Sequence, residues 1–170
     1  MWYDNLYHFP YGVTNMIQYA YYNSPFGLIK IGDSDGSIVC ITRADSPDAQ
    51  HSPTAITDLA FRQLSEYFAG SRAQFDFPIA PRGTAFQTAV WNALLDIPYG
   101  QTRSYKDIAA AIGNPKACRA VGMANHRNPI WIAIPCHRVV GSNQSLTGYA
   151  GGLDMKQALL ELERSHASSL

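Results

Sequence analysis

Three short runs rich in β-branched and aromatic side chains alternate with turn-forming segments in the first third of the chain. The runs cover residues 16–22, 27–32 and 37–42, and their composition is typical of β-strands. The segments NSPFG and DSDGS lie between them, and their Gly, Pro, Asp and Asn residues favour tight turns. The pattern predicts three strands joined by hairpin connections.

An amphipathic helix is predicted over residues 52–70, after the strands. Apolar residues recur there with helical spacing, at Ile56, Leu59, Ala60, Leu64 and Phe68. Ser52 is the expected N-cap and Pro53 the first helical residue. Residues 71–83 have the composition of a linker, with a short strand expected at 74–78.

The second half of the chain changes to a pattern of short helices. Thr84 and Gln87 have the spacing of a capping box at the start of one helix. Ser104 and Asp107 open a second helix that ends at a glycine, and a third is expected over residues 116–126. Two short helices joined by a tight Gly-containing turn resemble a helix-turn-helix.

A strand is expected at residues 130–134, followed by a Gly-rich loop and a last amphipathic helix over 153–163. With 170 residues, the chain is long enough for one compact domain or two small ones. The change of pattern predicts a β-rich domain with one helix at 1–80 and a helical domain at 81–170.

Composition excludes several classes of protein. No run of about 18 apolar residues occurs, so we expect no membrane-spanning segment, and the first residues show no signal peptide. The three cysteines, Cys40, Cys118 and Cys136, are far apart and do not cluster with the five histidines. This spacing argues against a zinc site or a disulfide framework. We therefore expect no metal, and a reducing, cytoplasmic location.

The net charge of zero conceals an asymmetry between the two halves. Residues 1–80 carry four basic against eight acidic side chains, whereas residues 81–170 carry nine basic against five acidic. Within residues 100–140 only Asp107 opposes six basic residues, which are Arg103, Lys106, Lys116, Arg119, Arg127 and Arg138. Such asymmetry indicates either a binding face or an uneven solvated surface.

The segment IPCHRVVG, residues 134–141, places a thiol, an imidazole and a guanidinium side by side. A thiol is nucleophilic only as thiolate, which cationic or proton-accepting neighbours such as His137 and Arg138 favour. In a strand Cys136 and His137 would point to opposite faces, but Pro135 indicates that the strand has ended. A water molecule could then bridge the two side chains. The alternative is a buried cysteine that ends a core strand, with His137 and Arg138 exposed beyond it, and these residues alone leave both interpretations open.

Residues 83–163 resemble the O6-alkylguanine-DNA alkyltransferases of the bacterial Ogt type, also called methylated-DNA–protein-cysteine methyltransferases. The motifs are GTAFQTAVWNALLDIPYGQTRSYKDIA, GNPKACRAVGMANHRNP, IPCHRVVGS and LTGYAGGLDMKQALLELE. The first half matches only in YYNSPFGLIKI and in its length. The resemblance implies an α/β (α+β) fold, with a β-rich ribonuclease H-like domain before a winged-helix domain that contains a helix-turn-helix.

The resemblance also implies irreversible transfer of an alkyl group to Cys136 from O6-alkylguanine in DNA, with O4-alkylthymine as a secondary substrate. Each molecule would act once, as a monomer and without a cofactor. His137 would act through a water and Glu163 would orient its imidazole. Tyr105 would contact the base and its rotated phosphate, and would donate a proton toward the departing guanine. Without the resemblance, Glu163 would be a solvated helix residue and Tyr105 a packing residue.

The target nucleotide must leave the stack of double-stranded DNA, which costs about a few kcal/mol. By resemblance, Arg119 enters the stack in its place, and Asn128 ties the recognition helix to the active-site turn. Ala120 and Gly122 would be small because the helix lies against the minor groove. The remaining expected DNA contacts are Lys116 and Arg127, and the expected walls of the guanine pocket are Val139, Tyr149 and Ala150.

Two positions depart from the family pattern. Ala150 stands where some members have a Ser that hydrogen-bonds the base, and Gln144 stands where Gly is common. Two functions of other classes remain as alternatives, namely a non-catalytic binder that marks lesions and a cysteine hydrolase. The related binding-only proteins replace the cysteine, often by Trp, whereas a hydrolase would turn over many times.

Overall fold

The computed structural model describes residues 16–47 and 51–167. The first residues, in which no signal peptide is predicted, lie outside these ranges. Among the described residues, no helix combines the length and the apolar character that a bilayer crossing requires.

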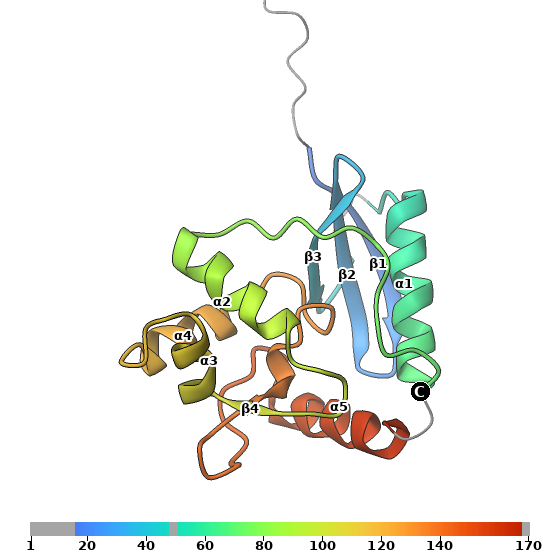
Figure 1. Ribbon diagram of the computed structural model, residues 1–170. Coiled ribbons are helices and arrows are strands. Elements are labelled where there is room, and N and C mark those ends of the chain that lie inside the picture. The colour runs from blue at the N-terminus through green and yellow to red at the C-terminus, as the bar shows by residue number, and fades with distance from the viewer. Residues whose placement is uncertain (1–15, 48–50, 168–170) are drawn as a thin grey trace, which may run out of the picture.

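The first half of the chain is a three-stranded antiparallel sheet with one helix beside it (Figure 1). Its strands are β1 (Gln18–Ser24), β2 (Gly27–Ser34) and β3 (Ser37–Arg43), paired in that order as two hairpins. Helix α1 (Ala55–Phe68) packs against the sheet. These elements confirm the three predicted strands, and each lies within two residues of its predicted bounds.

Helix α1 begins two residues later than predicted. Thr54, rather than Ser52, is the N-cap, because its hydroxyl accepts a hydrogen bond from the Thr57 backbone N–H and the Thr57 hydroxyl accepts one from the Thr54 N–H. This reciprocal pair satisfies two N–H groups at the start of the helix. Pro53 therefore precedes the cap instead of occupying the first turn.

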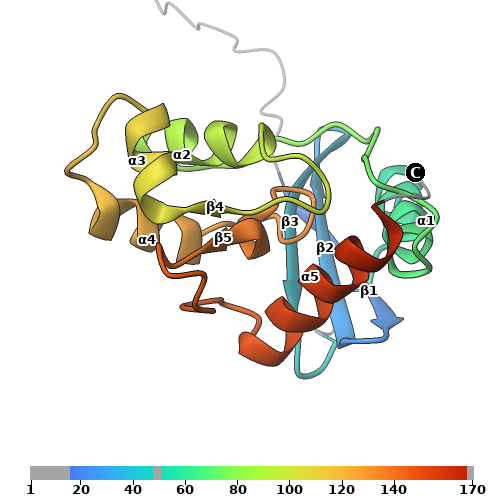
Figure 2. The same ribbon diagram turned by 60° about the horizontal axis from the view of Figure 1, so that its bottom comes forward.

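The second half is mainly helical and lies on the other side of the sheet from α1 (Figures 1 and 2). Its elements are α2 (Ala85–Leu95), β4 (Arg103–Ser104), α3 (Tyr105–Ala111), α4 (Cys118–His126), the 3₁₀ turn η1 (Cys136–Arg138), β5 (Val139–Val140) and α5 (Leu153–His166). Strands β4 and β5 pair in parallel. A sheet-bearing first half and a helical second half confirm the predicted mixed α/β fold class.

Local capping residues determine the starts of α2 and α3. Thr84 with Gln87, and Ser104 with Asp107, form complete capping boxes, as their sequence spacing predicts. Helix α4 starts later than the predicted residue 116 and has no side-chain cap. The preceding residues form a turn instead, in which the Ala117 N–H donates to the Asn114 carbonyl at 2.9 Å.

The predicted strand at 130–134 is not formed. Ile130 makes only an isolated bridge to Ile41 of β3, and Ile132 adopts a left-handed conformation with φ of 71°. A short run in which every residue is apolar satisfies a strand pattern and a turn packed on the core equally well. Similarly, the predicted strand at 74–78 is only a bridge between Ile79 and Ile38.

Both halves contribute to one continuous core. Buried residues from the sheet and α1 belong to the same cluster as those from α2, α4 and the segment before η1; they include Ile31, Ile41, Leu64, Trp91, Val121 and Ile134. Backbone hydrogen bonds also join β3 to the second half, from the Ile41 N–H to the Pro129 carbonyl at 2.8 Å and from the Trp131 N–H to the Ile41 carbonyl at 2.9 Å. The division at residue 80 stays a prediction.

Candidate active site

Cys136, His137 and Arg138 lie on the 3₁₀ turn η1, directly after Pro135. The Arg138 N–H donates to the Pro135 carbonyl at 3.0 Å and closes the turn. Strand alternation therefore does not apply, and neighbouring side chains are not forced to opposite faces. All three side chains are buried, which excludes the alternative of a core cysteine with exposed neighbours.

The Cys136 thiol is buried against two asparagines from the α4 region. Its Sγ accepts a hydrogen bond from Asn128 Nδ2 at 2.9 Å, and its carbonyl accepts one from Asn125 Nδ2 at 3.2 Å. Burial raises the pKa of the thiol to about 11, although the Asn128 hydrogen bond and the Lys156 ammonium oppose that rise. The resting side chain is thus a neutral thiol that needs a base before it can act as a nucleophile.

Asn128 connects the end of α4 to the active-site turn. Besides Cys136 Sγ, its Nδ2 reaches the Ile134 carbonyl at 2.8 Å, and its Oδ1 accepts from the Ile130 N–H at 3.0 Å. The Asn128 amide thus uses both its N–H donor and its oxygen acceptor to hold the segment from Ile130 to Cys136. Asn128 therefore occupies the place where the resemblance expects a residue that ties the recognition helix to the turn.

His137 and Glu163 form a buried pair, with 2.8 Å between His137 Nε2 and Glu163 Oε1. Burial lowers the pKa of His137, which Glu163 only partly offsets, and therefore the neutral imidazole is favoured. A carboxylate can only accept, so Nε2 carries the hydrogen and Nδ1 has a free lone pair. Nδ1 is buried without a hydrogen-bond partner among the described residues. Its lone pair is therefore available to accept a proton.

Glu163, on α5, accepts hydrogen bonds from three parts of the chain, which are α1, the segment before β4 and the turn η1. Arg138 donates from Nε at 3.1 and 3.0 Å and from Nη2 at 2.9 Å. The Gly100 N–H and the Tyr67 hydroxyl donate at 3.0 and 2.7 Å. Burial alone would raise the pKa of Glu163, but hydrogen bonds from His137 and Arg138 outweigh it and hold this pKa at about 2. The carboxylate is therefore ionised.

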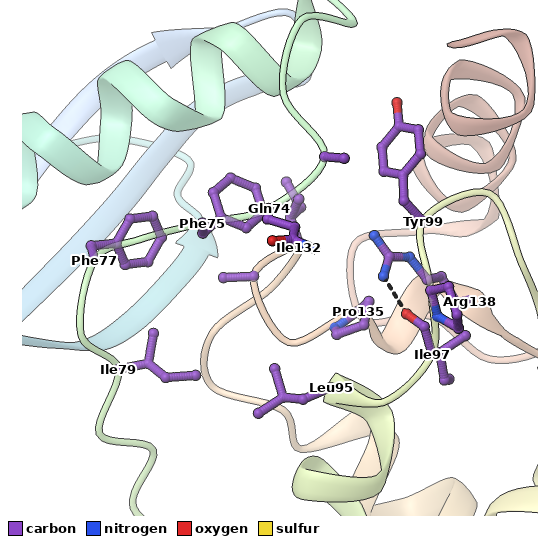
Figure 3. A pocket seen from close by; sticks show the side chains of 13 residues that line it. Gln74, Phe75, Phe77, Ile79, Leu95, Ile97, Tyr99, Ile132, Pro135 and Arg138 are labelled. Carbon is purple, nitrogen blue, oxygen red and sulfur yellow. Dashed lines mark hydrogen bonds between the residues drawn. The ribbon is translucent and has the colours of Figure 1, made fainter. Parts of the chain in front are cut away.

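The structure shows which partners hold Arg138, whose role the sequence does not explain. Its guanidinium pairs with Glu163, donates from Nη1 to the Ile97 carbonyl at 2.6 Å and lies 5.7 Å from the Tyr99 ring centre. Figure 3 shows this bond at one wall of a hollow of about 380 Å³, opposite Phe75 and Phe77. Pro135 and Arg138 line this hollow and Cys136 does not. The hollow is therefore not the site of the thiol.

Lys156 is a buried amine that sequence reasoning missed. Its Nζ donates to the Val139 carbonyl at 2.5 Å and to the Thr147 carbonyl at 2.8 Å. Burial lowers its pKa to about 8, and the neighbouring Cys136 opposes the shift. The amine links β5 to the loop at residues 141–152 and places a positive charge near the thiol. Its spacing on an amphipathic helix gave no signal of either role.

The residues expected to line a guanine pocket lie around this loop. Tyr149 is buried and packs at 5.9 Å from the Trp131 ring, while Val139 is buried and Ala150 is exposed. Burial, with the nearby Cys136, raises the pKa of Tyr149 well above its usual value. The Tyr105 hydroxyl donates to the Thr147 carbonyl at 3.2 Å. Tyr149 thus lies close to the thiol, and Tyr105 contacts the loop that carries Tyr149.

Gln144, at a position where the resemblance expects Gly, lies in a turn of the loop. Its φ is 64°, in the left-handed region that favours glycine, and its N–H donates to the Gly141 carbonyl at 2.8 Å. The turn therefore forms despite the larger side chain.

The residues expected to contact DNA lie apart from the catalytic cluster, on α4 and the turns at its two ends. Lys116, Arg119, Ala120 and Arg127 are exposed, and Gly122 is half-buried. A Cβ added to Gly122 would lie 3.8 Å from the Tyr105 ring. The opposite side of the same helix carries Asn125, which contacts Cys136. Helix α4 therefore connects an exposed basic face to the buried thiol.

The described part of the chain contains no group of three or more His, Cys, Asp or Glu side chains that could hold a metal ion. Its three cysteines are free thiols.

Comparison with known proteins gives consistent matches for both halves. Residues 17–81 match the family model described as 6-O-methylguanine DNA methyltransferase, ribonuclease-like domain, and residues 85–165 match the DNA binding domain of the same name. A methylated-DNA–protein-cysteine methyltransferase of Methanosarcina acetivorans is 50% identical over 153 residues, covering 86% of this chain and 98% of that protein. Its counterpart from Mycolicibacterium paratuberculosis is 48% identical, covering 89% and 95%.

Solved structures extend the match to three dimensions. A crystal structure of Mycobacterium tuberculosis O6-methylguanine methyltransferase superimposes with a TM-score of 0.82 at 44% identity, covering 89% of this chain and 94% of that chain. Mycobacterium tuberculosis OGT in complex with DNA gives a TM-score of 0.80 at 45% identity, covering 87% and 93%.

Proposed function

Because this chain belongs to the 6-O-methylguanine DNA methyltransferase family, we propose that it repairs DNA by moving the alkyl group of O6-alkylguanine onto Cys136. One observation carries the assignment to this residue. The only cysteine of the three that is fully buried lies on a turn beside a His137–Glu163 pair whose free imidazole nitrogen is unpartnered among the described residues.

The proton of the thiol passes through a water molecule to His137 Nδ1. Glu163, ionised and bonded to Nε2, stabilises the imidazolium that forms. Asn128 and the Lys156 ammonium stabilise the thiolate. Proton transfer is needed because a thiol with a pKa of about 11 contains very little thiolate near neutral pH.

The thiolate then attacks the carbon attached to guanine O6. A sulfur–carbon bond forms, the carbon–O6 bond breaks, and guanine leaves with the bonding electron pair. Tyr105, whose hydroxyl faces the loop at Thr147, donates a proton toward the departing base and is reprotonated from solvent. The thioether is stable, so each molecule reacts once, and no cofactor takes part.

DNA is held on the α4 face, and the damaged nucleotide is flipped toward the turn. Arg119 fills the stack, since a planar guanidinium is weakly hydrated and suits that position. Lys116 and Arg127 contact phosphates, while Ala120 and Gly122 allow α4 to approach the minor groove. Val139, Tyr149 and Ala150 line the pocket for the base.

We further propose a monomer that acts in the cytoplasm and accepts O4-alkylthymine as a secondary substrate. A reducing compartment suits three free thiols, one of which must stay reduced to react.

The first test follows a labelled methyl group from O6-methylguanine in duplex DNA. One label per protein should appear on Cys136, and Cys136→Ser should take up none, because serine offers no comparable nucleophile. Mass spectrometry of the modified peptide locates the label, and Cys118→Ser serves as a control that should react like the wild type.

Two outcomes would contradict the proposal. Unmodified protein that retains bound DNA would indicate a binder that only marks lesions. Turnover beyond one equivalent, with the label released to solvent, would indicate a hydrolase.

A further inference from the structure

Tyr67 reaches the active site from the other half of the chain. It lies near the carboxyl end of α1, next to the sheet, and is completely buried. Its hydroxyl lies 2.7 Å from Glu163 Oε1 and 3.4 Å from His137 Nε2. These contacts span 96 and 70 residues of sequence. One side chain of the sheet-bearing half therefore touches both members of the catalytic pair.

Packing accounts for the ring of Tyr67 but not for its hydroxyl. The ring contacts Phe68, Phe75 and Tyr99 at 5.8, 5.6 and 6.0 Å between centroids, and a phenylalanine would fill the same space. A buried hydroxyl without a hydrogen bond is costly. Here that hydroxyl is directed at the one oxygen of Glu163 that also bonds His137.

The direction of the hydrogen bond is determined by its partners. An ionised Glu163 can only accept, so the Tyr67 hydroxyl donates. Burial, together with the Glu163 charge, raises the pKa of Tyr67 well above its usual value, which keeps its proton in place. A donor on Oε1 disperses part of the negative charge and restricts the orientation of the carboxylate.

We propose that Tyr67 is a positioning residue for alkyl transfer, which acts through Glu163 to set the orientation and basicity of His137. The inference rests on the proposed function of the site. By dispersing the charge of Oε1, the Tyr67 hydroxyl limits how strongly Glu163 favours the imidazolium, and His137 therefore stays neutral until the thiol proton arrives.

Other charged or titratable groups also face His137. Glu163 and Lys156 of α5 and Arg138 of η1 act on His137 directly, Cys136 precedes it in the chain, and Tyr99, of the segment before β4, acts on Glu163 and Tyr67. Replacing Tyr67 by Phe leaves all of them in place and removes one hydroxyl. A shift in the titration of His137 in that variant can therefore be assigned to the hydroxyl.

The test is the rate of alkyl transfer to Tyr67→Phe, measured as a function of pH in a single turnover. The rate constant should fall on the order of ten-fold, the lower end of what removing an outer partner of a functional histidine costs. The rise of the rate with pH should also move to higher pH. Its physical reason is that a less dispersed Glu163 charge raises the pKa of His137, so the neutral base forms later. Imidazole NMR of His137 should show the same shift.

Tyr22→Phe is the matched control. The Tyr22 hydroxyl also donates to a carboxylate at 2.7 Å, that of Asp58 on α1, and its ring stacks on Phe61. It does not contact the active site. Its loss should leave the rate and the pH profile of the wild type unchanged.

A second variant keeps the ring and the hydroxyl in case Tyr67→Phe does not fold. With 3-fluorotyrosine at position 67, a stronger donor of nearly the same size, the rise of the rate should move to lower pH. An unchanged profile in either folded variant, or a uniform loss of rate without a shift, would overturn the positioning role. Failure of the wild type to transfer the alkyl group would instead refute the proposed function.

Discussion

At the scale of single residues, the site is built around one carboxylate. Glu163 accepts hydrogen bonds from Tyr67, His137, Arg138 and Gly100, and none of these donors is close to it in sequence. Removing one member of a buried ion pair typically costs about 3–5 kcal/mol, because the other charge is left without compensation. Glu163 therefore supports the fold as well as the proton transfer.

The free energy of unfolding in acid should show how much Glu163 stabilises the fold. The pKa of Glu163 is about 2 in the folded protein, below its ordinary 4.5, so its contribution is complete above pH 4.5. As the pH falls from 4.5 toward 2, the unfolded chain takes up the proton first and the free energy of unfolding drops, by about 3 kcal/mol in all. Urea unfolding of the wild type between pH 6 and 3 measures this slope.

Glu163→Gln should be less stable than the wild type at pH 6, the difference should narrow toward pH 3, and its slope should be shallower, since glutamine does not titrate. Glu66→Gln is the control, because the Glu66 carboxylate is partly exposed on α1, where it pairs with Arg72. It should keep the wild-type slope. Equal slopes in all three proteins would show that Glu163 does not carry the acid sensitivity.

At the scale of elements, α4 lies between the proposed DNA-binding surface and the Cys136 thiol. Its exposed side carries Arg119, and its buried side carries Asn125, which holds the carbonyl of Cys136. Asn128, just past its end, holds the sulfur. Asn125 and Asn128 follow Arg119 by only six and nine positions, so one short helix connects the exposed guanidinium to the residues that hold Cys136.

Arg119→Ala should weaken repair of duplex DNA far more than reaction with free O6-benzylguanine. Only the duplex requires a nucleotide to leave the stack. In Arg119→Ala, no guanidinium is present to take the place of the flipped base. Single-turnover rates on both substrates measure the difference. Arg164→Ala, an exposed arginine on α5, should affect neither, and equal losses on both substrates for Arg119→Ala would remove the stack-filling role.

At the scale of the whole molecule, the two halves differ in charge and in what they contribute to the site. The second half carries the basic surface, and the acidic first half supplies β3, which hydrogen-bonds to the backbone on both sides of Ile130, and Tyr67, which bonds Glu163. We therefore expect DNA to bind on the second half, while the first half holds the active-site turn from behind.

The salt dependence of DNA binding should distinguish the second half of the chain from the first. Binding to duplex DNA releases about 0.9 counterions per neutralised phosphate, so the affinity should fall as salt rises. Arg127→Ala, at the end of α4, should reduce the slope of log K against log salt by about one unit, and Arg43→Ala, exposed at the end of β3, should leave it unchanged. Fluorescence anisotropy over a salt series measures both, and a flat response of the wild type would refute the assignment of the face.

Much of the architecture follows from local sequence. The three strands, the capping boxes of α2 and α3, and the amphipathic α5 depend on side-chain alternation, helical spacing and hydrogen bonds between near neighbours, all of which the sequence displays. The start of α1 was wrong by two residues because Ser52 and Thr54 are both able to cap. The strand predicted at 130–134 was wrong because all five residues are apolar, so the sequence lacks the apolar–polar alternation that distinguishes a strand from a turn.

The sequence by itself determined the family, because contiguous motifs carry the resemblance, and that resemblance singled out Cys136 and His137 as the candidate site. Only the tertiary structure decided what surrounds them. The pairing of Arg138 with Glu163, the bonds of Lys156 to two carbonyls and the approach of Tyr67 from α1 each join residues 9 to 96 positions apart. The physical reason is that a buried charge or hydroxyl must find a partner, and which partner it finds depends on how the chain packs rather than on its neighbours in sequence.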